Sequence, residues 1–335
     1  MEAPRYELAE LHFHLGQSIE PHILWSIAHE QGIKLPTKDY HRFVDIITLN
    51  KPHVTWSDYH NLYRWTELIQ SSPSAMERSL YENITGAYRT NNITLLEPGF
   101  NPMYRNRGGE QDLDQIILAS LRGMERALAE FPKVRAGIIF MLDRRLPFKK
   151  NKVIVQKAIK YRNRGVIGID IAGPHHAGFD YKDYIGLYTE AQEASLKTTT
   201  HIGEDGTPEE MDEVLNQLPL DRINHGIKAV ESKSLMRKVV EKNLTLCLCP
   251  SSNLKVGFIK GVPQLKKTIQ TLYNNGVKIC FNTDSPSMLR TNLVNEISII
   301  RDNAILTESQ IQRTIKWAFE ASFINLKNKH DNLYL

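Results

Sequence analysis

Eight short apolar runs, each separated from the next by a longer amphipathic segment, constrain the fold of this chain more than any other feature. The runs are rich in β-branched residues and are typical of strands, whereas the segments between them repeat their apolar residues with helical spacing. Strand followed by helix, repeated along a chain, builds a parallel sheet, and eight such units are the number that closes a barrel. We therefore predict an α/β protein with a (β/α)8 TIM barrel fold, with an open doubly wound sheet as the alternative. The predicted strands are residues 8–14, 93–97, 134–141, 166–171, 197–201, 222–225, 244–249 and 277–282.

The domain organisation follows from length and from the spacing of the first two strands. A chain of 335 residues, 41% hydrophobic and without a low-complexity linker or repeat, can fold as one barrel, so we predict a single domain over residues 1–335. The long gap between the first two strands contains Trp56, Tyr59, Tyr63 and Trp65. We expect inserted helices after strand 1, with residues 36–75 forming a lid over the C-terminal face, where barrel active sites lie.

Charge and cysteine content restrict the partners and the compartment. The formal net charge is +4, from 42 basic and 38 acidic residues, which is too small to indicate nucleic-acid binding. Cys247, Cys249 and Cys280 do not form a disulfide framework, and the chain begins without an apolar signal segment. No apolar run reaches the 18 to 20 residues, roughly, that cross a bilayer. A cytoplasmic chain with no membrane association is expected. The sequence does not tell whether the chain has protein partners.

Histidines and one aspartate mark the ends of several predicted strands. Because alternate residues of a strand face the same side, His12 and His14 project together. His201, His225 and Asp284 close three further strands, so all five side chains can meet at one end of a barrel. Imidazole and carboxylate groups suit zinc and similar metals, and a catalytic site needs about three protein ligands plus an open position. The pattern predicts a catalytic metal site.

Beyond these residues, a set of motifs spread over nearly the whole chain resembles the adenosine deaminase family of the amidohydrolase superfamily. The motifs are Ala9-Glu10-Leu11-His12-Phe13-His14-Leu15, Ile169-Asp170-Ile171-Ala172-Gly173, Thr200-His201-Ile202-Gly203-Glu204, Asn224-His225-Gly226, Cys249-Pro250-Ser251-Ser252-Asn253 and Asn282-Thr283-Asp284-Ser285-Pro286. The resemblance implies one zinc ion per chain, held by four ligands. Those ligands are His12, His14, His201 and Asp284, with Glu204 as proton shuttle, His225 beside the metal-bound water and Gly173 against the purine.

The resemblance also implies a chemistry that needs these residue types. Zinc lowers the pKa of its bound water from about 16 toward 7, which supplies hydroxide at neutral pH. A carboxylic acid with a raised pKa, here Glu204, can protonate a ring nitrogen while the amine-bearing carbon is attacked. His225 and Asp284 can hold and deprotonate the attacking water. The expected reaction is hydrolytic removal of the 6-amino group of an adenine compound. Because the Pro-Cys-x-x-Cys pattern of cytidine-type deaminases is absent, Cys247 and Cys249 are interpreted as core residues.

Two departures from the family pattern concern the substrate. Where adenosine-specific members usually carry an aspartate for the 5′-hydroxyl, this chain has Gly16, followed by Gln17 and Ser18. Where the family usually has a second aspartate facing the purine N7, this chain has Ser285, an uncharged donor. We interpret Gly16, Gln17, Ser18, Ser285 and Gly173 as substrate-binding residues.

Loss of the acid at Gly16 removes repulsion of a phosphate, so 5′-monophosphates are expected beside nucleosides, ribo or deoxy, with a slight preference for the monophosphate. Arg105, Arg107, Arg144 and Arg145 are the basic candidates near that end. Two alternatives remain open from the sequence. One is deamination of another amino-heterocycle, such as a free purine base or a pterin, and the other is a zinc-containing binding or assembly subunit with little catalysis.

Overall fold

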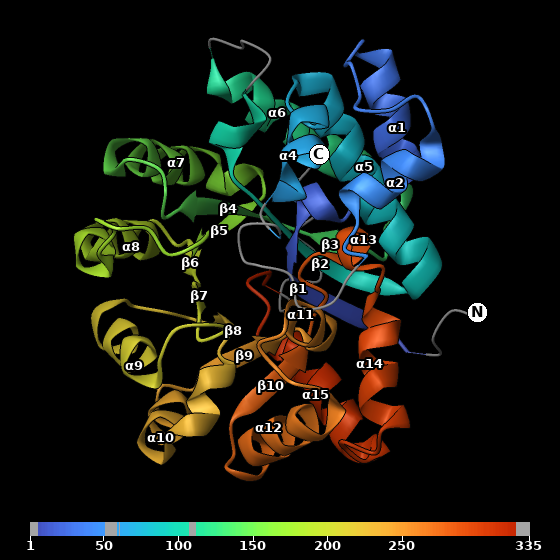
Figure 1. Cartoon of the computed structure of the whole chain (residues 1–335). Helices are drawn as coiled ribbons and strands as arrows, with labels where there is room; N and C mark the ends of the chain where they lie inside the picture. Colours follow the sequence, from blue (N-terminus) through green and yellow to red (C-terminus); the bar gives the residue numbers. More distant parts are fainter. Residues whose placement is uncertain (1–5, 51–58, 60, 107–111, 326–335) are drawn as a thin grey trace.

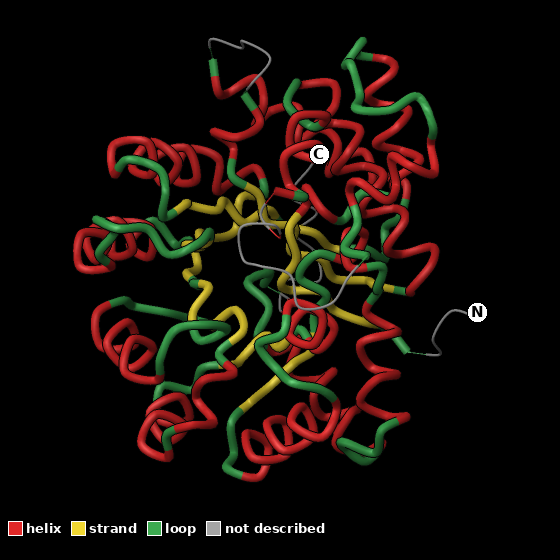
Figure 2. The backbone as a smooth tube through the Cα atoms, in the orientation of Figure 1, coloured by secondary structure: helices red, strands yellow, loops and turns green. Residues whose placement is uncertain are grey.

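The strands of the protein form a closed inner ring that is surrounded by helices (Figures 1 and 2). The computed structural model describes residues 6–50, 59, 61–106 and 112–325. Every predicted strand is present in it, and two of the eight predicted runs are each divided into two short strands. Within the described residues the strands are β1 (Leu8–His14), β2 (Ile93–Phe100), β3 (Arg135–Ala136), β4 (Ile138–Asp143), β5 (Val166–Ala172), β6 (Lys197–Thr198), β7 (His201–Ile202), β8 (Ile223–His225), β9 (Thr245–Leu248) and β10 (Lys278–Phe281).

Hydrogen bonds close the ring into a barrel. One parallel sheet runs β1-β2-β4-β5-β6, with β3 also beside β2, and a second runs β7-β8-β9-β10. Since β6 and β7 belong to one predicted run, the two sheets are continuous there. At the other junction, the amide of His14 donates to the carbonyl oxygen of Asp284 at 2.7 Å. The amide of Asp284 donates in turn to the carbonyl oxygen of His12 at 3.1 Å. The barrel prediction is therefore confirmed, and the open sheet is excluded.

Amphipathic helices cover the outside of the barrel, as the apolar periodicity predicts. Several of them start at a side-chain cap: Thr207 accepts from the amide of Glu210, and Thr307 forms a reciprocal capping box with Gln310. The outer helices are α5 (Pro73–Asn91), α6 (Leu113–Glu130), α7 (Phe148–Tyr161), α8 (Ile185–Glu193), α9 (Pro208–Gln217), α10 (Lys233–Glu241), α12 (Val262–Asn274) and α15 (Glu308–Glu320). The loops after β9 and β10 contain α11 (Pro250–Val256), α13 (Pro286–Leu289) and α14 (Leu293–Asp302). No helix of the described part is long and apolar enough to cross a bilayer.

In the described part of the segment between β1 and β2, three helices precede α5, as expected for an insertion after strand 1. They are α1 (Pro21–Glu30), α2 (Tyr40–Ile47) and α4 (Tyr63–Ile69), so the helical part begins upstream of residue 36. Trp56 lies outside the described residues. Helix α4 is held over the C-terminal end of β1, because Gln70 donates to the carbonyl oxygen of Gly16 at 2.9 Å and Gln17 donates to Thr66 at 3.1 Å. Single-domain organisation and lid function remain predictions.

A buried ion pair lies at the N-terminal end of the barrel. Arg222, which directly precedes β8, and Glu97 of β2 are both fully buried and lie 2.7 Å apart. The residues that follow α15 cover this pair: the Phe323 ring lies 3.9 Å from the Arg222 guanidinium, and the Phe323 amide and Ser322 hydroxyl each donate to Glu97 at 2.7 Å. Ser322 and Phe323, which follow α15, therefore close this end of the barrel, opposite the predicted active site.

Candidate active site

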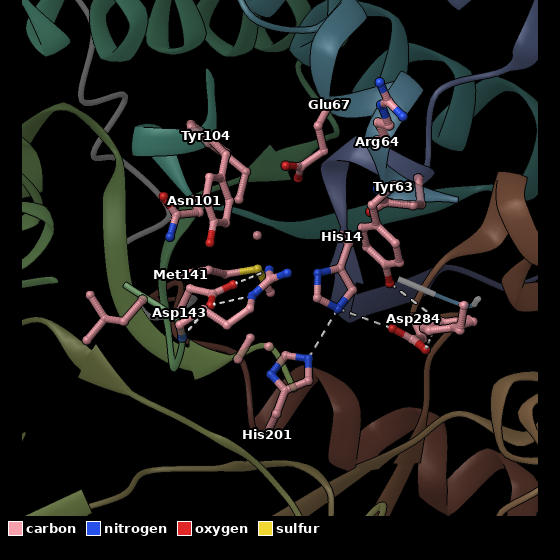
Figure 3. A pocket seen from close by; sticks show the side chains of 18 of the residues that line it. His14, Tyr63, Arg64, Glu67, Asn101, Tyr104, Met141, Asp143, His201 and Asp284 are labelled. Carbon is pink, nitrogen blue, oxygen red and sulfur yellow. Dashed lines mark hydrogen bonds and ion pairs between the residues drawn. The ribbon is translucent and has the colours of Figure 1, made fainter. Parts of the chain in front are cut away.

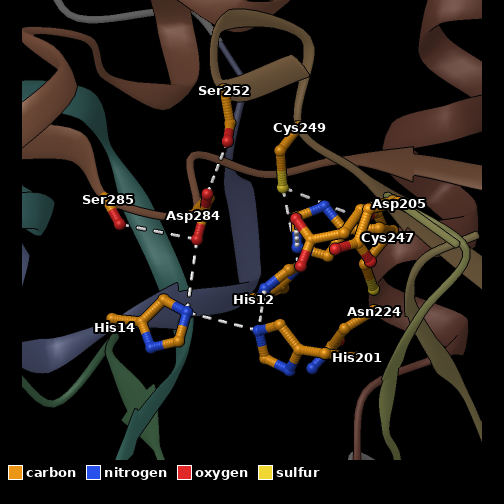
Figure 4. Close-up of polar contacts among 12 residues, drawn as sticks. His12, His14, His201, Asp205, Asn224, Cys247, Cys249, Ser252, Asp284 and Ser285 are labelled. Atoms are coloured by element: carbon orange, nitrogen blue, oxygen red, sulfur yellow. Dashed lines mark hydrogen bonds and ion pairs between the residues drawn. The ribbon is translucent and has the colours of Figure 1, made fainter. Parts of the chain in front are cut away.

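Three imidazoles and one carboxylate from the ends of β1, β7 and the segment after β10 meet at one point (Figure 4). The Nε2 atoms of His12 and His201 are 3.0 Å apart, and those of His201 and His14 are 3.2 Å apart. An oxygen of Asp284 lies 3.3 Å from Nε2 of His14. The structure thus brings together the four side chains that the family resemblance implies as metal ligands.

The opposite atoms of these ligands are held by buried partners. Asp170 lies 2.8 Å from Nδ1 of His201, Cys249 lies 3.5 Å from Nδ1 of His12, and Ser252 donates to Asp284 at 2.6 Å. Such outer contacts select the tautomer and the orientation of metal-binding histidines. With Nδ1 occupied, the Nε2 lone pairs of His12 and His201 are directed at the same point.

This donor set fits a divalent metal ion. Possible ligand atoms of His12, His14 and Asp284, and likewise of His12, His201 and His225, all lie within 4.8 Å of one another. Burial lowers the pKa of His12 well below its ordinary value, so its imidazole is neutral, the form that binds metals. Although burial opposes it, the hydrogen bond from His14 helps hold the pKa of Asp284 well below its usual range, so this group is a carboxylate. Imidazoles that converge on one carboxylate are the ligand chemistry of zinc sites.

Glu204 and His225 lie beside this cluster. Nε2 of His225 is 3.2 Å from the Glu204 carboxylate. Burial, reinforced by the nearby Asp284 charge, raises the pKa of Glu204 well above its ordinary value and so favours its protonated form. Burial lowers the pKa of His225 to about 3, which leaves a neutral imidazole. The pair therefore combines a carboxyl group whose protonated form is favoured with a neutral base.

A cavity of about 350 Å³ opens from the cluster (Figure 3). This volume suits one small-molecule ligand. His14, His201, Glu204, His225 and Asp284 form its inner end. Gly173 also lines it, with a backbone φ of +88°, and a Cβ there would lie 2.8 Å from a carboxylate oxygen of Asp143. The outer walls include Gln17, Arg64, Glu67, Asn101, Tyr104, Arg105, Met141, Asp143 and Arg145.

The residues predicted to bind substrate are placed in different ways. Gly173 and Gln17 line the cavity, whereas Gly16 lies against the buried Arg105 guanidinium. Ser18 does not line the cavity, because its hydroxyl donates to the carbonyl oxygen of Leu15 and accepts from Asn83, both at 2.9 Å. For these residues only the positions are established.

Ser285 lies behind two tyrosines of the inserted region. Its hydroxyl is 3.3 Å from the Tyr59 hydroxyl and 3.1 Å from the Tyr63 hydroxyl. Its side chain is fully buried, and the cavity is lined by Tyr59 and Tyr63 in its place. The predicted direct contact of Ser285 with a ligand is thus obstructed by the tyrosines.

The basic candidates also separate into groups. Arg105 and Arg145 line the cavity, where they pair with Glu67 at 3.2 Å and with Asp143 at 2.7 Å. Arg144 is instead buried behind the cavity wall, where it donates to Tyr181 and to the carbonyl oxygens of Gly173 and His201. Its role is to hold two strand ends together. Arg107 lies outside the described residues.

Sequence reasoning missed several residues that support the site. Asp170 and Ser252 stand in motifs that were recognised, but no role was predicted for them. Cys249 was interpreted as a core residue; it is buried, and its thiol also touches His12. Tyr59 and Tyr63 were expected only as part of a lid. Their aromatic cluster was the only sequence signal, and it does not reveal hydroxyl contacts with residues more than 200 positions away.

A buried cluster of histidines and a carboxylate at the C-terminal end of a (β/α)8 barrel, next to a buried glutamate, defines the class of metal-dependent hydrolases. The model of the adenosine deaminase family matches residues 7–333 of the chain. The chain belongs to the adenosine deaminase family. It is accordingly a hydrolase that acts on C–N bonds of cyclic amidines, a deaminase of adenine-type compounds.

Curated relatives span both base- and nucleoside-specific names. An adenine deaminase of Ectopseudomonas mendocina (strain ymp) is 26% identical over 324 residues, which cover 93% of this chain and 96% of the relative. An adenosine deaminase of Vibrio vulnificus (strain YJ016) is 25% identical over 301 residues, which cover 90% of this chain and 89% of the relative.

Solved structures share the fold. A zinc-bound amidohydrolase of Burkholderia ambifaria has a TM-score of 0.83 at 18% identity, covering 97% of this chain and 90% of the other. The Arabidopsis N6-mAMP deaminase has a TM-score of 0.80 at 22% identity, and the match covers 95% of this chain and 93% of the other.

Proposed function

We propose that the protein is a zinc-dependent hydrolase that removes the 6-amino group of an adenine-containing 5′-monophosphate, ribo or deoxy, to give the inosine-type product and ammonia. The corresponding nucleosides are the second candidate. The observation that carries the monophosphate proposal is the contact between Gly16 and Arg105. A Cβ at position 16 would lie only 2.7 Å from Nη2 of Arg105, so a guanidinium occupies the space that an acidic side chain would need.

The charge balance of the outer cavity supports an anionic substrate. Among the described residues that line it, three arginines (Arg64, Arg105 and Arg145) accompany two carboxylates (Glu67 and Asp143). A planar guanidinium can bind two phosphate oxygens at once, which makes arginine a preferred phosphate ligand. An aspartate at position 16 would instead repel the phosphate. The outer cavity is therefore better suited to a 5′-phosphate than to a bare 5′-hydroxyl.

In this proposal His12, His14, His201 and Asp284 hold one zinc ion per chain. Zinc held by such ligands lowers the pKa of bound water toward about 7, which supplies the nucleophile at neutral pH. The zinc-bound Burkholderia ambifaria amidohydrolase supports this choice of ion. The chain's own residues would then position the purine, with Gly173 allowing close approach of the ring because it has no side chain.

Glu204 is the proposed proton carrier. Since burial raises its pKa and favours the protonated carboxyl, it can donate to the ring nitrogen next to the amine-bearing carbon as that carbon becomes tetrahedral. The resulting carboxylate can then take a proton from the attacking water and pass it to the departing ammonia, and the remaining O–H proton, lost as the C6 carbonyl forms, restores the protonated carboxyl. His225, 3.2 Å from Glu204, is placed to accept a hydrogen bond from the attacking water and so orient it.

A substrate panel tests this proposal directly. Purified protein loaded with zinc would be incubated with adenine, adenosine, deoxyadenosine, AMP and dAMP, and ammonia release would be followed. A kcat/KM highest for a monophosphate is expected. Highest activity on adenine would favour the reaction named for the Ectopseudomonas relative. Absence of turnover on every 6-aminopurine would leave a pterin deaminase or a binding subunit as the remaining readings.

A pair of variants tests the phosphate contact. Because Arg105 and Glu67 form a buried pair, Arg105→Gln is best combined with Glu67→Gln, so that no buried charge is left alone. The double variant should lose about 10- to 100-fold in kcat/KM on AMP, the scale of a hydrogen bond to a charged group, and little on adenosine. Glu67→Gln alone is the control for loss of the carboxylate, and it should retain more activity on AMP than the double variant, because Arg105 is still present. Equal losses on AMP and adenosine would contradict phosphate binding at Arg105.

A further inference from the structure

We propose that the hydroxyl of Tyr63, presented by the inserted helix α4, is the donor that recognises N7 of the purine. This inference rests on the proposed function, because it requires a 6-aminopurine in the cavity. It assigns to the inserted region a specificity role that the sequence had placed on Ser285.

The chemistry of the ring defines where the N7 donor must lie. In a 6-aminopurine the reacting carbon C6 has N1 on one side and, beyond C5, N7 on the other. A group that protonates N1 and a group that binds N7 must therefore stand on opposite sides of the metal cluster. Glu204 contacts His225, which belongs to the donor triad His12-His201-His225. The N7 donor is accordingly expected at the other triad, which contains His14 and Asp284.

Tyr63 lines the cavity on that second side (Figure 3). Its ring meets the His14 ring edge to face, with centroids 5.9 Å apart, and its hydroxyl lies 3.1 Å from Ser285, the neighbour of Asp284. A phenol has an ordinary pKa of about 10, so the Tyr63 hydroxyl keeps its proton at neutral pH and can act as a donor. An unprotonated N7 is an acceptor, which needs such a donor.

The hydroxyl groups near Asp284 are hydrogen-bonded to one another, and their directions indicate which hydroxyl can donate its proton to a ligand. Asp284 is a carboxylate and only accepts, and it takes the protons of Ser252 at 2.6 Å and of Tyr59 at 3.2 Å. Since a hydroxyl has one proton, Tyr59 can then only accept from its other neighbours. Ser285 is enclosed by Asp284, Tyr59 and Tyr63 and has no surface on the cavity. Tyr63 is the outer member, so its proton can turn from Ser285 or Tyr59 toward a ligand.

The experiment compares purines with and without N7. The kcat/KM values for AMP and 7-deaza-AMP (adenosine and 7-deazaadenosine if the nucleoside is the substrate) would be measured in the wild-type protein and in variants. Tyr63→Phe should lower kcat/KM for AMP by about 3- to 10-fold, the scale of one neutral hydrogen bond, and leave 7-deaza-AMP unchanged. The preference for AMP over 7-deaza-AMP should therefore fall by the same factor. Tyr63→Gln, which keeps an N–H donor, should retain part of this preference.

Two matched variants make the result decisive. Tyr104→Phe removes a phenol from the outer cavity wall and should not change the preference, whereas Ser285→Ala should change it less than Tyr63→Phe does. A preference that is lost in Ser285→Ala and kept in Tyr63→Phe would assign N7 to Ser285 and overturn the proposal. Equal losses on both substrates in Tyr63→Phe would show a structural role and also overturn it. Failure of the wild-type protein to deaminate any 6-aminopurine would refute the proposed function, and the assignment of Tyr63 with it.

Discussion

His12 is the residue on which both donor triads depend, and its surroundings show how single residues prepare the site. Asn282 accepts from the amides of Leu11 at 2.8 Å and His12 at 3.1 Å, which anchors the end of β1 to the strand that closes the barrel. His225 and Asp284 both have left-handed backbone conformations, with φ of 67° and 63°. Residues other than glycine adopt this conformation at a cost, and two of the described residues that do so lie here at the site.

Proton transfer by Glu204 can be tested with the conservative substitution Glu204→Gln. Glu204→Gln keeps the size and the hydrogen-bonding ability of the side chain but cannot transfer a proton. We expect metal content and KM to remain near the wild-type values and kcat to fall by roughly 100-fold or more, the usual scale of general acid–base catalysis. Steady-state kinetics with the best substrate of the panel would measure this. A kcat within a factor of a few of the wild type would remove Glu204 from proton transfer.

At the scale of elements, the segments after β5 and β7 are joined by one histidine. Nε2 of His175 is 3.1 Å from Asp205, and Nδ1 is 3.4 Å from Glu210 at the start of α9. The hydrogen bond to Asp205 raises the pKa of His175, although burial and the charge of Arg144 oppose the shift. These contacts link the loop that follows Gly173 to the residue after Glu204.

The raised pKa of His175 predicts a pH-dependent contribution to stability. A group whose pKa is raised by folding stabilises the folded state below its unfolded pKa, about 6.5, and this contribution disappears as the pH rises through the folded value. The melting temperature of the wild type should therefore exceed that of His175→Gln near pH 5.5, and the difference should shrink by about pH 8.5. His176→Gln, at the exposed neighbouring histidine, is the control. A difference independent of pH would refute the ionic origin.

The buried ion pair at the N-terminal end of the barrel makes a second prediction at this scale. Arg222→Met leaves Glu97 without its ion-pair partner in a fully buried position, which should lower the free energy of unfolding by about 3–5 kcal/mol. Combining it with Glu97→Gln should restore much of the loss, because the uncompensated charge is removed. Arg301→Met, at an exposed ion pair with Glu308, is the control and should cost about 0–1 kcal/mol. Urea denaturation would measure all of these. A double variant no more stable than Arg222→Met would show that the charge is not the cause.

For the whole molecule, the barrel and the ligand cluster depend on each other. The ligands come from the first strand, the fifth predicted run and the segment after the last strand, so a metal bound to them joins distant parts of the chain. A ligand that binds only the folded state stabilises it, by about 4 kcal/mol when present at 1,000 times its Kd. Metal binding should therefore raise the stability of the complete domain.

Metal removal tests this coupling. We expect about one zinc or similar ion per chain by elemental analysis, and chelation should lower the melting temperature by roughly 5–10 °C. His201→Ala should lose most of the metal, and chelation should have little further effect on that variant. Full metal content in His201→Ala would exclude this residue from the ligand set.

The sequence by itself determined the barrel and the convergence of its polar residues, because both follow from local periodicity. Alternation places His12 and His14 on one face, and in a parallel barrel all strands end at the same rim, so His201, His225 and Asp284 had to arrive nearby. The sequence did not determine which side chains reach the ligand. Ser18 turns away to Asn83, Arg105 occupies the space beside Gly16, and Tyr63 covers Ser285. Only the tertiary structure decided these three placements, because each depends on which distant side chain fills a given space, and close packing between residues far apart in the chain leaves no periodic signal in the sequence.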